Sequence, residues 1–148
     1  MGRFNKTLIF ALVFVLAMGL CGCGGEYKDG IYTAEMPEFS DSGWRDIMEL
    51  EIQNGEITRI NWDAVYIDDT IPIRKKQYSK SGLYGMLVEG AVGEWYDQAI
   101  AIEQYVIENG VDSFRLNNEG RTDTVAGCTI HVNAFERLVR ECLEQAAK

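Results

Sequence analysis

Asp46 to Ile67 reads DIMELEIQNGEITRINWDAVYI, two alternating runs on either side of Asn54-Gly55. An Asn-Gly pair between such runs favours a two-residue type I′ turn, because both central positions need a positive φ. In each run, alternate residues are expected to lie on opposite faces of a strand. In the first run, one face carries Met48, Leu50 and Ile52, and the other carries Ile47, Glu49, Glu51 and Gln53. In the second run, one face carries Ile57, Arg59, Asn61 and Asp63, and the other carries Thr58, Ile60, Trp62 and Ala64. The stretch therefore predicts a β-hairpin with strands over 46–53 and 57–67.

The flanking sequence supplies further elements for a layered fold. It predicts a strand over 30–36 ended by Pro37, a polar loop over 37–43, a loop with short pieces over 68–90, a helix over 91–109, a polar connection over 111–123 and a last helix over 133–147. Asn133 is expected as the N-cap of the last helix, with Glu136 completing a box-like pattern. The expected fold class is α+β: an antiparallel or mixed sheet built around the hairpin, with two main helices packed on it.

The N-terminal residues predict a lipoprotein signal. Arg3 and Lys6 precede an uncharged apolar run over 8–20, which is too short to cross a hydrocarbon core of about 30 Å and is typical of a secretory signal. Leu20-Cys21-Gly22-Cys23 follows and resembles the bacterial lipobox, whose cysteine is diacylated and becomes the new N-terminus. Two acyl chains give a stable anchor. We expect a signal peptide over 1–22, a lipid-anchored tether over 23–29 attached through Cys23, and one domain over 30–148 on the extracytoplasmic face of the cell membrane.

Composition narrows the classes of partner and site. The chain has 148 residues, 14 Lys plus Arg against 23 Asp plus Glu, and a formal net charge of -9. Such an acidic chain repels a phosphate backbone, so no nucleic-acid partner is expected. A single histidine excludes any zinc site that needs two, and we expect no resident metal.

Candidate chemistry lies in Asp123 to Asn133, which reads DTVAGCTIHVN. Small residues and a hydroxyl lead into the start of the last predicted helix, where unpaired backbone N–H groups and the helix dipole attract an anion such as phosphate. Gly127 permits a close backbone approach, and Thr129 adds a hydroxyl at the same place. The alternative is a loop that only caps its helix.

This segment resembles the motif of the FMN-binding domain family, which includes flavin-carrying subunits of bacterial ion-pumping redox complexes and small surface lipoproteins of Gram-positive bacteria. The motif is an Asp, two residues, then Ser/Thr-Gly-Ala-Thr, with a helix beginning near a Phe. It maps onto Asp123, Ala126-Gly127-Cys128-Thr129 and Phe135. The resemblance continues in order through Asp29 to Glu35, Gly43-Trp44, the hairpin around Asn54-Gly55, and Trp62-Asp63-Ala64, with Tyr78 and Met86 near a Tyr and a Met of the lipoprotein branch.

The resemblance implies FMN as the cofactor, bound covalently or non-covalently. A covalent link would be a phosphoester on Thr129 made by a flavin transferase, with neighbouring amides holding the phosphate and Asp123 in the motif that the transferase recognises. The implied cofactor-binding residues are Asp123, Ala126, Gly127, Cys128, Thr129, Ile130 and His131. This chain differs from the family where Ala126 replaces Ser/Thr and where His131-Val132 replaces a pair of hydroxyl residues.

The ring of such a cofactor needs apolar or aromatic walls. The candidates are Trp44, Trp62, Tyr84, Met86 and Trp95, each of which could instead be an ordinary core or rim residue. Because the chain has no dinucleotide fingerprint, we expect an electron carrier served by a donor at the membrane, with no catalytic residue and no substrate of its own. The rival interpretation is a flavin-free surface lipoprotein that kept the fold as a ligand-binding or interaction module.

Other clusters have alternative interpretations. Cys128, His131 and Cys142 could suggest a metal site, but Cys142 lies about three helical turns beyond His131, too far for one ion. A Cys128–His131 pair could suggest a hydrolase, with the thiol pKa lowered at the helix start. Asp63, Asp68 and Asp69 lack EF-hand spacing and predict a solvated acidic face. The basic run Arg74-Lys75-Lys76 predicts an exposed loop, with contact to a phosphate or a partner as the alternative.

Overall fold

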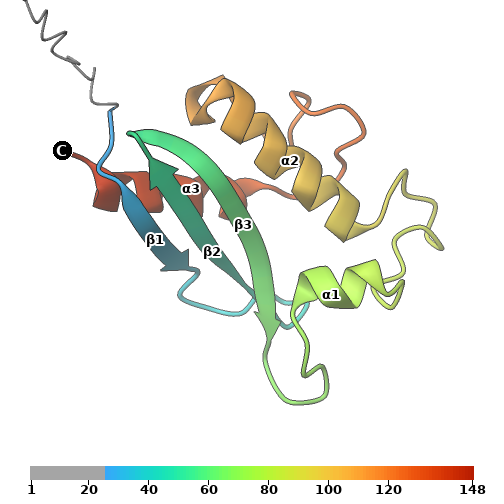
Figure 1. Ribbon diagram of the computed structural model, residues 1–148. Helices are drawn as coiled ribbons and strands as arrows, with labels where there is room; N and C mark the ends of the chain where they lie inside the picture. The colour runs from blue at the N-terminus through green and yellow to red at the C-terminus, as the bar shows by residue number, and fades with distance from the viewer. Residues whose placement is uncertain (1–25) are drawn as a thin grey trace, which may run out of the picture.

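The computed structural model describes residues 26–148 as a three-stranded antiparallel sheet with helices (Figure 1). Its elements are β1 (Gly30–Glu35), β2 (Trp44–Gln53), β3 (Glu56–Tyr66), α1 (Lys75–Lys80), α2 (Trp95–Asn109), the 3-10 turn η1 (Val111–Ser113) and α3 (Asn133–Ala146). The strand order is β1-β2-β3. The predicted α+β class is confirmed. The predicted signal peptide and Cys23 lie outside the described residues, and within 26–148 no helix is long and apolar enough to cross a membrane.

The predicted hairpin is confirmed as the β2–β3 pair. Asn54 and Gly55 both have positive φ, 55° and 76°, as a type I′ turn requires. The Gly55 N–H also donates to Oδ1 of Asp29 at 2.8 Å, which ties the turn to the residue before β1. The tip of the hairpin is therefore fixed by the turn conformation of Asn54-Gly55 and by one hydrogen bond to Asp29, the residue before the neighbouring strand β1.

A β-bulge changes the predicted alternation at the start of β3. Ile52 pairs with Ile57 while Glu51 pairs with Arg59, so the register shifts across Thr58. Ile57 consequently packs against the core on the same side as Ile52. The prediction that Ile57 shares a face with Arg59 is wrong, because the bulge inserts an unpaired residue between them.

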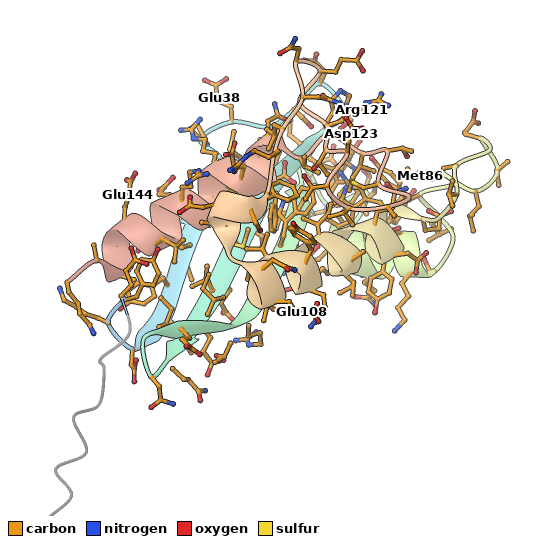
Figure 2. All side chains as sticks on the ribbon, turned by 90° about the horizontal axis from the view of Figure 1, so that it is seen from above. Glu38, Met86, Glu108, Arg121, Asp123 and Glu144 are labelled. Carbon is orange, nitrogen blue, oxygen red and sulfur yellow. The ribbon has the colours of Figure 1, made fainter. Side chains whose placement is uncertain are left out.

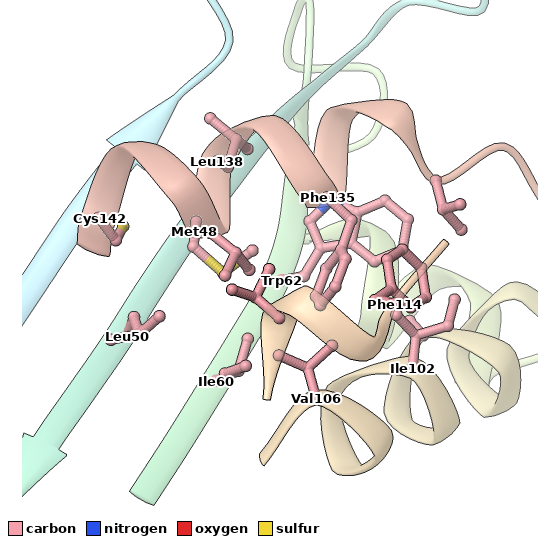
Figure 3. Close-up of a cluster of buried hydrophobic side chains, with 14 of the residues drawn as sticks. Met48, Leu50, Ile60, Trp62, Ile102, Val106, Phe114, Phe135, Leu138 and Cys142 are labelled. Atoms are coloured by element: carbon pink, nitrogen blue, oxygen red, sulfur yellow. The ribbon is translucent and has the colours of Figure 1, made fainter. Parts of the chain in front are cut away.

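The core lies between one face of the sheet and two helices. Helix α3 packs on β1 and β2, and α2 packs on β3 (Figure 1). Phe135 of α3 contacts both the sheet and the segment after η1. The centre of its ring lies 5.3 Å from that of Trp62 in β3 and 5.5 Å from that of Phe114. The labelled core residues fill the space between the strands and the two helices (Figure 3): Met48, Leu50, Ile60, Trp62, Ile102, Val106, Phe114, Phe135, Leu138 and Cys142. Phe114 places a core residue in the predicted polar connection.

Helix starts differ from the predictions for reasons of capping. Helix α2 begins at Trp95, not at residue 91, because Glu94 and Asp97 form a reciprocal capping box. Asn133 is the first residue of α3 and not its cap; Val132 occupies the N-cap position, and no side chain caps the helix. The predicted Asn133–Glu136 box does not form. Helix α1 was not predicted, since residues 75–80 show no apolar periodicity.

The two ends of the described chain lie side by side (Figure 1). Tyr27 forms an antiparallel bridge with Ala147, and the Lys28 N–H donates to the Ala146 carbonyl at 2.9 Å. Backbone pairing thus joins the start of the domain to the end of α3.

Gly43 carries a testable constraint of this fold. Its φ is +82°, and a Cβ there would lie 2.7 Å from Cε2 of Tyr66, whereas Gly82, with φ +77°, has open space. We expect Gly82→Ala to cost about 1–2 kcal/mol of unfolding free energy from backbone strain alone. Gly43→Ala should lose about 1–3 kcal/mol more from overpacking against the ring. Urea unfolding of both variants measures the difference, and equal losses would contradict the predicted clash.

Candidate functional site

One pocket of about 820 Å³ opens where segments distant in the sequence converge. It is bounded by the β1–β2 loop, the start of β2, the first residue of α1, the loop before α2, the loop before α3 and the first turns of α3. Its volume lies within the range of about 300–1,000 Å³ of pockets that bury small-molecule ligands. The predicted polar loop at 37–43 forms one wall through Pro37, Glu38, Phe39, Ser40 and Ser42.

All five predicted aromatic and apolar wall residues line this pocket. Trp62 and Trp95 also belong to the core, with ring centroids 4.9 Å apart, so the wall and core interpretations both apply to them. The rings of Trp44 and Tyr84 lie 6.5 Å apart. Trp62 is held by its indole N–H, which donates to Oδ1 of Asp46 at 3.1 Å. The pocket is therefore walled by aromatic rings, which are held by packing and, for Trp62, by one half-buried hydrogen bond.

Lys75 is the most unusual group in the pocket. Its side chain is buried, at 8% exposure, and its Nζ lies 4.5, 5.0 and 5.8 Å from the ring centroids of Trp95, Tyr84 and Trp44. Burial lowers the pKa of Lys75 to about 8, opposed by the carboxylates of Asp46 and Asp63. The predicted exposure of this basic run is wrong for Lys75, because cation–π contact with three rings compensates part of its desolvation.

The neighbouring charged residues are buried or half-buried: Asp63 and Glu103 are buried, and Asp46 and Lys76 are half-buried. Desolvation raises the pKa of Asp46, while Lys75 and the hydrogen bond from Trp62 act against that rise. Lys76 points to the other side of α1, where its Nζ donates to Oε1 of Glu103 at 2.6 Å. Asp63 accepts from the backbone N–H of Lys76 at 2.9 Å and is only 6% exposed, so it does not belong to the predicted solvated acidic face.

The segment singled out by sequence divides among three places. Thr129, Ile130 and His131 line the large pocket. Ala126, Gly127 and Cys128 line a separate depression of about 170 Å³ beside Gln98. Asp123 faces a third hollow with Arg115; Figure 2 shows it near Arg121 on the loop before α3, while Met86 lies on the loop before α2. The structure therefore joins only the C-terminal part of the motif to the aromatic walls.

The side chain of Gln98 in α2 accepts hydrogen bonds from two backbone N–H groups that the motif predicts as phosphate donors. Its Oε1 accepts from the backbone N–H groups of Thr129 at 2.7 Å and Ile130 at 3.2 Å, and its Nε2 donates to the Gly93 carbonyl at 3.0 Å. The expectation that amides beside Thr129 hold a phosphate is therefore wrong for these two N–H groups. Sequence reasoning missed Gln98, because it lies 31 residues from Thr129 in the chain.

A different set of donors faces the pocket from α3. Asn133, Ala134 and Arg137 line it, together with His131. No side chain caps this helix, so its first backbone N–H groups lack the usual capping acceptor. Within residues 26–148 the Arg137 guanidinium makes no hydrogen bond or ion pair. Arg137 was not singled out by sequence, although it lies one turn beyond Asn133 on the predicted helix.

The alternative chemistries gain no support from this geometry. Burial raises the pKa of the Cys128 thiol, opposite to the shift that would activate a nucleophile. Cys128 and His131 line different hollows. Cys128 and Cys142 are both free thiols. Across the described part of the chain, no group of three or more His, Cys, Asp or Glu could hold a metal ion.

The burial of Lys75 predicts a pH dependence of stability. Because its pKa falls from 10.5 to about 8 on folding, Lys75 binds more protons in the unfolded chain between those pH values, and its contribution to the free energy of unfolding rises with pH across that window. The shift corresponds to a gain of about 3 kcal/mol. Urea unfolding from pH 7 to 11 should show the unfolding free energy of Lys75→Met falling behind that of the wild type across this window, while Lys80→Met stays parallel to the wild type. This comparison cancels the opposing contribution of Cys142, whose pKa burial raises to about 12. Parallel curves for wild type and Lys75→Met would contradict it.

Two solved structures share this fold, while no protein-family model matches the chain. The solution NMR structure of a protein from Clostridium thermocellum aligns with a TM-score of 0.59 and 35% sequence identity, over 82% of this chain and 93% of that one. The crystal structure of a protein from Clostridium perfringens aligns with a TM-score of 0.63 and 21% identity, over 81% of this chain and 88% of that one. The second likeness concerns the fold alone.

A curated relative matches almost the whole sequence. The "15 kDa lipoprotein" of Treponema pallidum (strain Nichols) is 24% identical over 139 residues, which is 94% of this chain and 89% of that protein. A match of 139 residues is longer than the described part, 26–148, so it extends into the predicted signal segment. The chain is thus similar to a small lipoprotein, in agreement with the lipobox prediction.

Proposed function

We propose that this chain, which belongs to the same family as the Clostridium thermocellum protein, is a membrane-anchored lipoprotein that binds FMN in the aromatic pocket and carries electrons. The observation that carries the proposal is that one pocket is lined both by aromatic rings and by groups that can donate to an anion. Three tryptophans and a tyrosine line it from the sheet, α2 and the loop before α2, while Arg137, His131 and the uncapped start of α3 line it from another side.

This donor set fits the two parts of FMN. A planar, largely apolar ring suits walls of fixed aromatic side chains. A phosphate monoester carries about −1.5 to −2 charges near pH 7 and suits an arginine and an open helix N-terminus. Arg137 has no competing acidic partner among residues 26–148. The residues proposed to hold the phosphate are therefore Arg137, His131 and the first N–H groups of α3.

Thr129 supports a covalent variant of the same proposal. It lines the pocket beside His131, and its exposed side chain has a weak contact, 3.4 Å, from Oγ1 to Oε1 of Gln98. In the family that the motif resembles, the corresponding threonine is the acceptor for a flavin transferase. Gln98 fixes the backbone at this position through the Thr129 N–H, so the acceptor would stand on an ordered segment.

Bound FMN would supply the electron-transfer chemistry, and the chain's own residues would bind and orient it. Anchoring at Cys23 would hold the domain near an electron donor in the membrane, on the extracytoplasmic face. Among residues 26–148, no hydrogen bond joins a hydroxyl group of this pocket to His131 or Lys75, and we propose a carrier in preference to an enzyme with its own substrate.

Arg137 provides the test of FMN binding, because riboflavin lacks the phosphate. The full chain in detergent should bind FMN more tightly than riboflavin in fluorescence-quenching titrations. Arg137→Met should weaken FMN binding about tenfold or more while leaving riboflavin nearly unchanged, consistent with loss of a charge-assisted contact of about 1.5–3 kcal/mol. Arg140→Met, on the same helix but outside the pocket and paired with Asp112 and Glu136, is the matched control. No binding of either flavin would favour the flavin-free module instead.

Thr129→Val tests the covalent variant. When the chain is expressed with a flavin transferase, intact mass should increase by one FMN in the wild type, and the flavin should remain with the denatured protein. The valine variant keeps the shape of threonine but has no hydroxyl, so it should lose the added mass while still binding FMN reversibly. Ser42→Ala, which removes another hydroxyl from the pocket lining, is the control. Flavin retained by the denatured Thr129→Val variant would contradict this attachment site.

A further inference from the structure

Lys75 brings a buried positive charge to the pocket without a protein acceptor. Its side chain is 8% exposed and lines the pocket at the first position of α1. Within residues 26–148 the ammonium makes no hydrogen bond and no salt bridge; its partners are the faces of Trp44, Tyr84 and Trp95. An ammonium has three N–H donors, and aromatic faces do not satisfy them as oxygen or nitrogen acceptors do. The geometry leaves these donors available to a ligand among the rings.

Neither of the two neighbouring carboxylates forms a salt bridge with the Lys75 ammonium. Asp46, from β2, and Asp63, from β3, act on Lys75 through space without forming a salt bridge to it. Asp46 accepts the indole N–H of Trp62, and Asp63 accepts the backbone N–H groups of Ala64 and Lys76. Both carboxylates are thus engaged by other donors, and Lys75 lies over three rings of the aromatic walls.

We propose that Lys75 makes the pocket bind the negatively charged, reduced form of a flavin ring more tightly than the neutral, oxidised form. This inference rests on the proposed FMN function and deepens it by assigning the residue that sets the redox preference of the site. A buried charge interacts strongly in a region of low dielectric, so a ring that gains a negative charge gains attraction to the ammonium.

The charge that the flavin ring gains on reduction links the binding preference to the reduction potential of bound FMN. Reduction of the neutral ring by two electrons, supplied by dithionite, with uptake of one proton from water gives a ring of charge −1. Tighter binding of that form raises the reduction potential of bound FMN above that of free FMN. For a two-electron couple, a tenfold preference corresponds to about 30 mV.

The experiment compares the full-length wild type, Lys75→Met and Lys75→Arg, each in detergent and loaded with FMN. The potential is read by spectroelectrochemical titration at pH 7, and the dissociation constants of oxidised and reduced FMN are measured separately under anaerobic conditions. We expect Lys75→Met to lose at least tenfold of the preference for reduced FMN and about 30 mV of potential. Lys75→Arg should retain most of both. Lys80→Met is the matched control on the same helix, because Lys80 contacts Tyr96 outside the pocket.

Each outcome has one meaning. An unchanged potential and an unchanged ratio of dissociation constants in Lys75→Met would overturn this inference while leaving FMN binding intact. Absence of FMN binding by the wild type would overturn the proposed function, and this inference with it. If Lys75→Met does not fold, the wild type and Lys75→Arg decide together. A wild-type potential at or below that of free FMN in the same buffer overturns the inference, and a higher potential that Lys75→Arg retains supports it.

Discussion

The packing of Trp62 is the constraint on which both the core and the pocket depend. Its side chain is 2% exposed, with rings of Trp95 and Phe135 at 4.9 and 5.3 Å. One edge of the same indole lines the pocket, where its N–H is bound by Asp46. Because α2 supplies Trp95 and α3 supplies Phe135, the indole fixes how both helices sit on the sheet. The part of the pocket wall that Trp62 and Trp95 form is therefore continuous with the core.

A buried ionic contact next to Trp62 places α1 and, through it, Lys75. Oε1 of Glu103 accepts from the Trp62 backbone N–H and from Nζ of Lys76, both at 2.6 Å. Burial raises the pKa of Glu103, which the Lys76 ammonium and the Trp62 N–H oppose. Asp63 holds the backbone of Lys76 as well. The two consecutive lysines of this short helix therefore make different contacts. Lys76 binds Asn61 of β3 and Glu103 of α2, which holds α1 against both elements, and Lys75 lies in the aromatic pocket.

The parts of the structure that depend on local signals could be predicted, and those that depend on distant contacts could not. Asn54-Gly55 predicts the hairpin because the turn conformation is a property of these two residues. Ile57 was misplaced because a bulge is set by pairing across strands. The aromatic walls followed from residue type, but Lys75 did not, since its burial needs rings from three separate segments. The contact of Gln98 with the loop before α3 likewise has no local signal.

Net charge and local charge answer different questions about partners. A formal charge of -9 argues against binding an extended polyanion, whose many phosphates would meet the whole acidic surface. A small ligand inside a pocket meets chiefly the charges within a Debye length, about 8–10 Å at physiological salt. There Arg137 and Lys75, neither with a salt-bridge partner among the described residues, balance Glu38 and Asp46, the two carboxylates that line the same pocket. An acidic domain can therefore exclude nucleic acid and still hold one compact anion, provided that the anion also carries a ring to fill the aromatic part of the pocket.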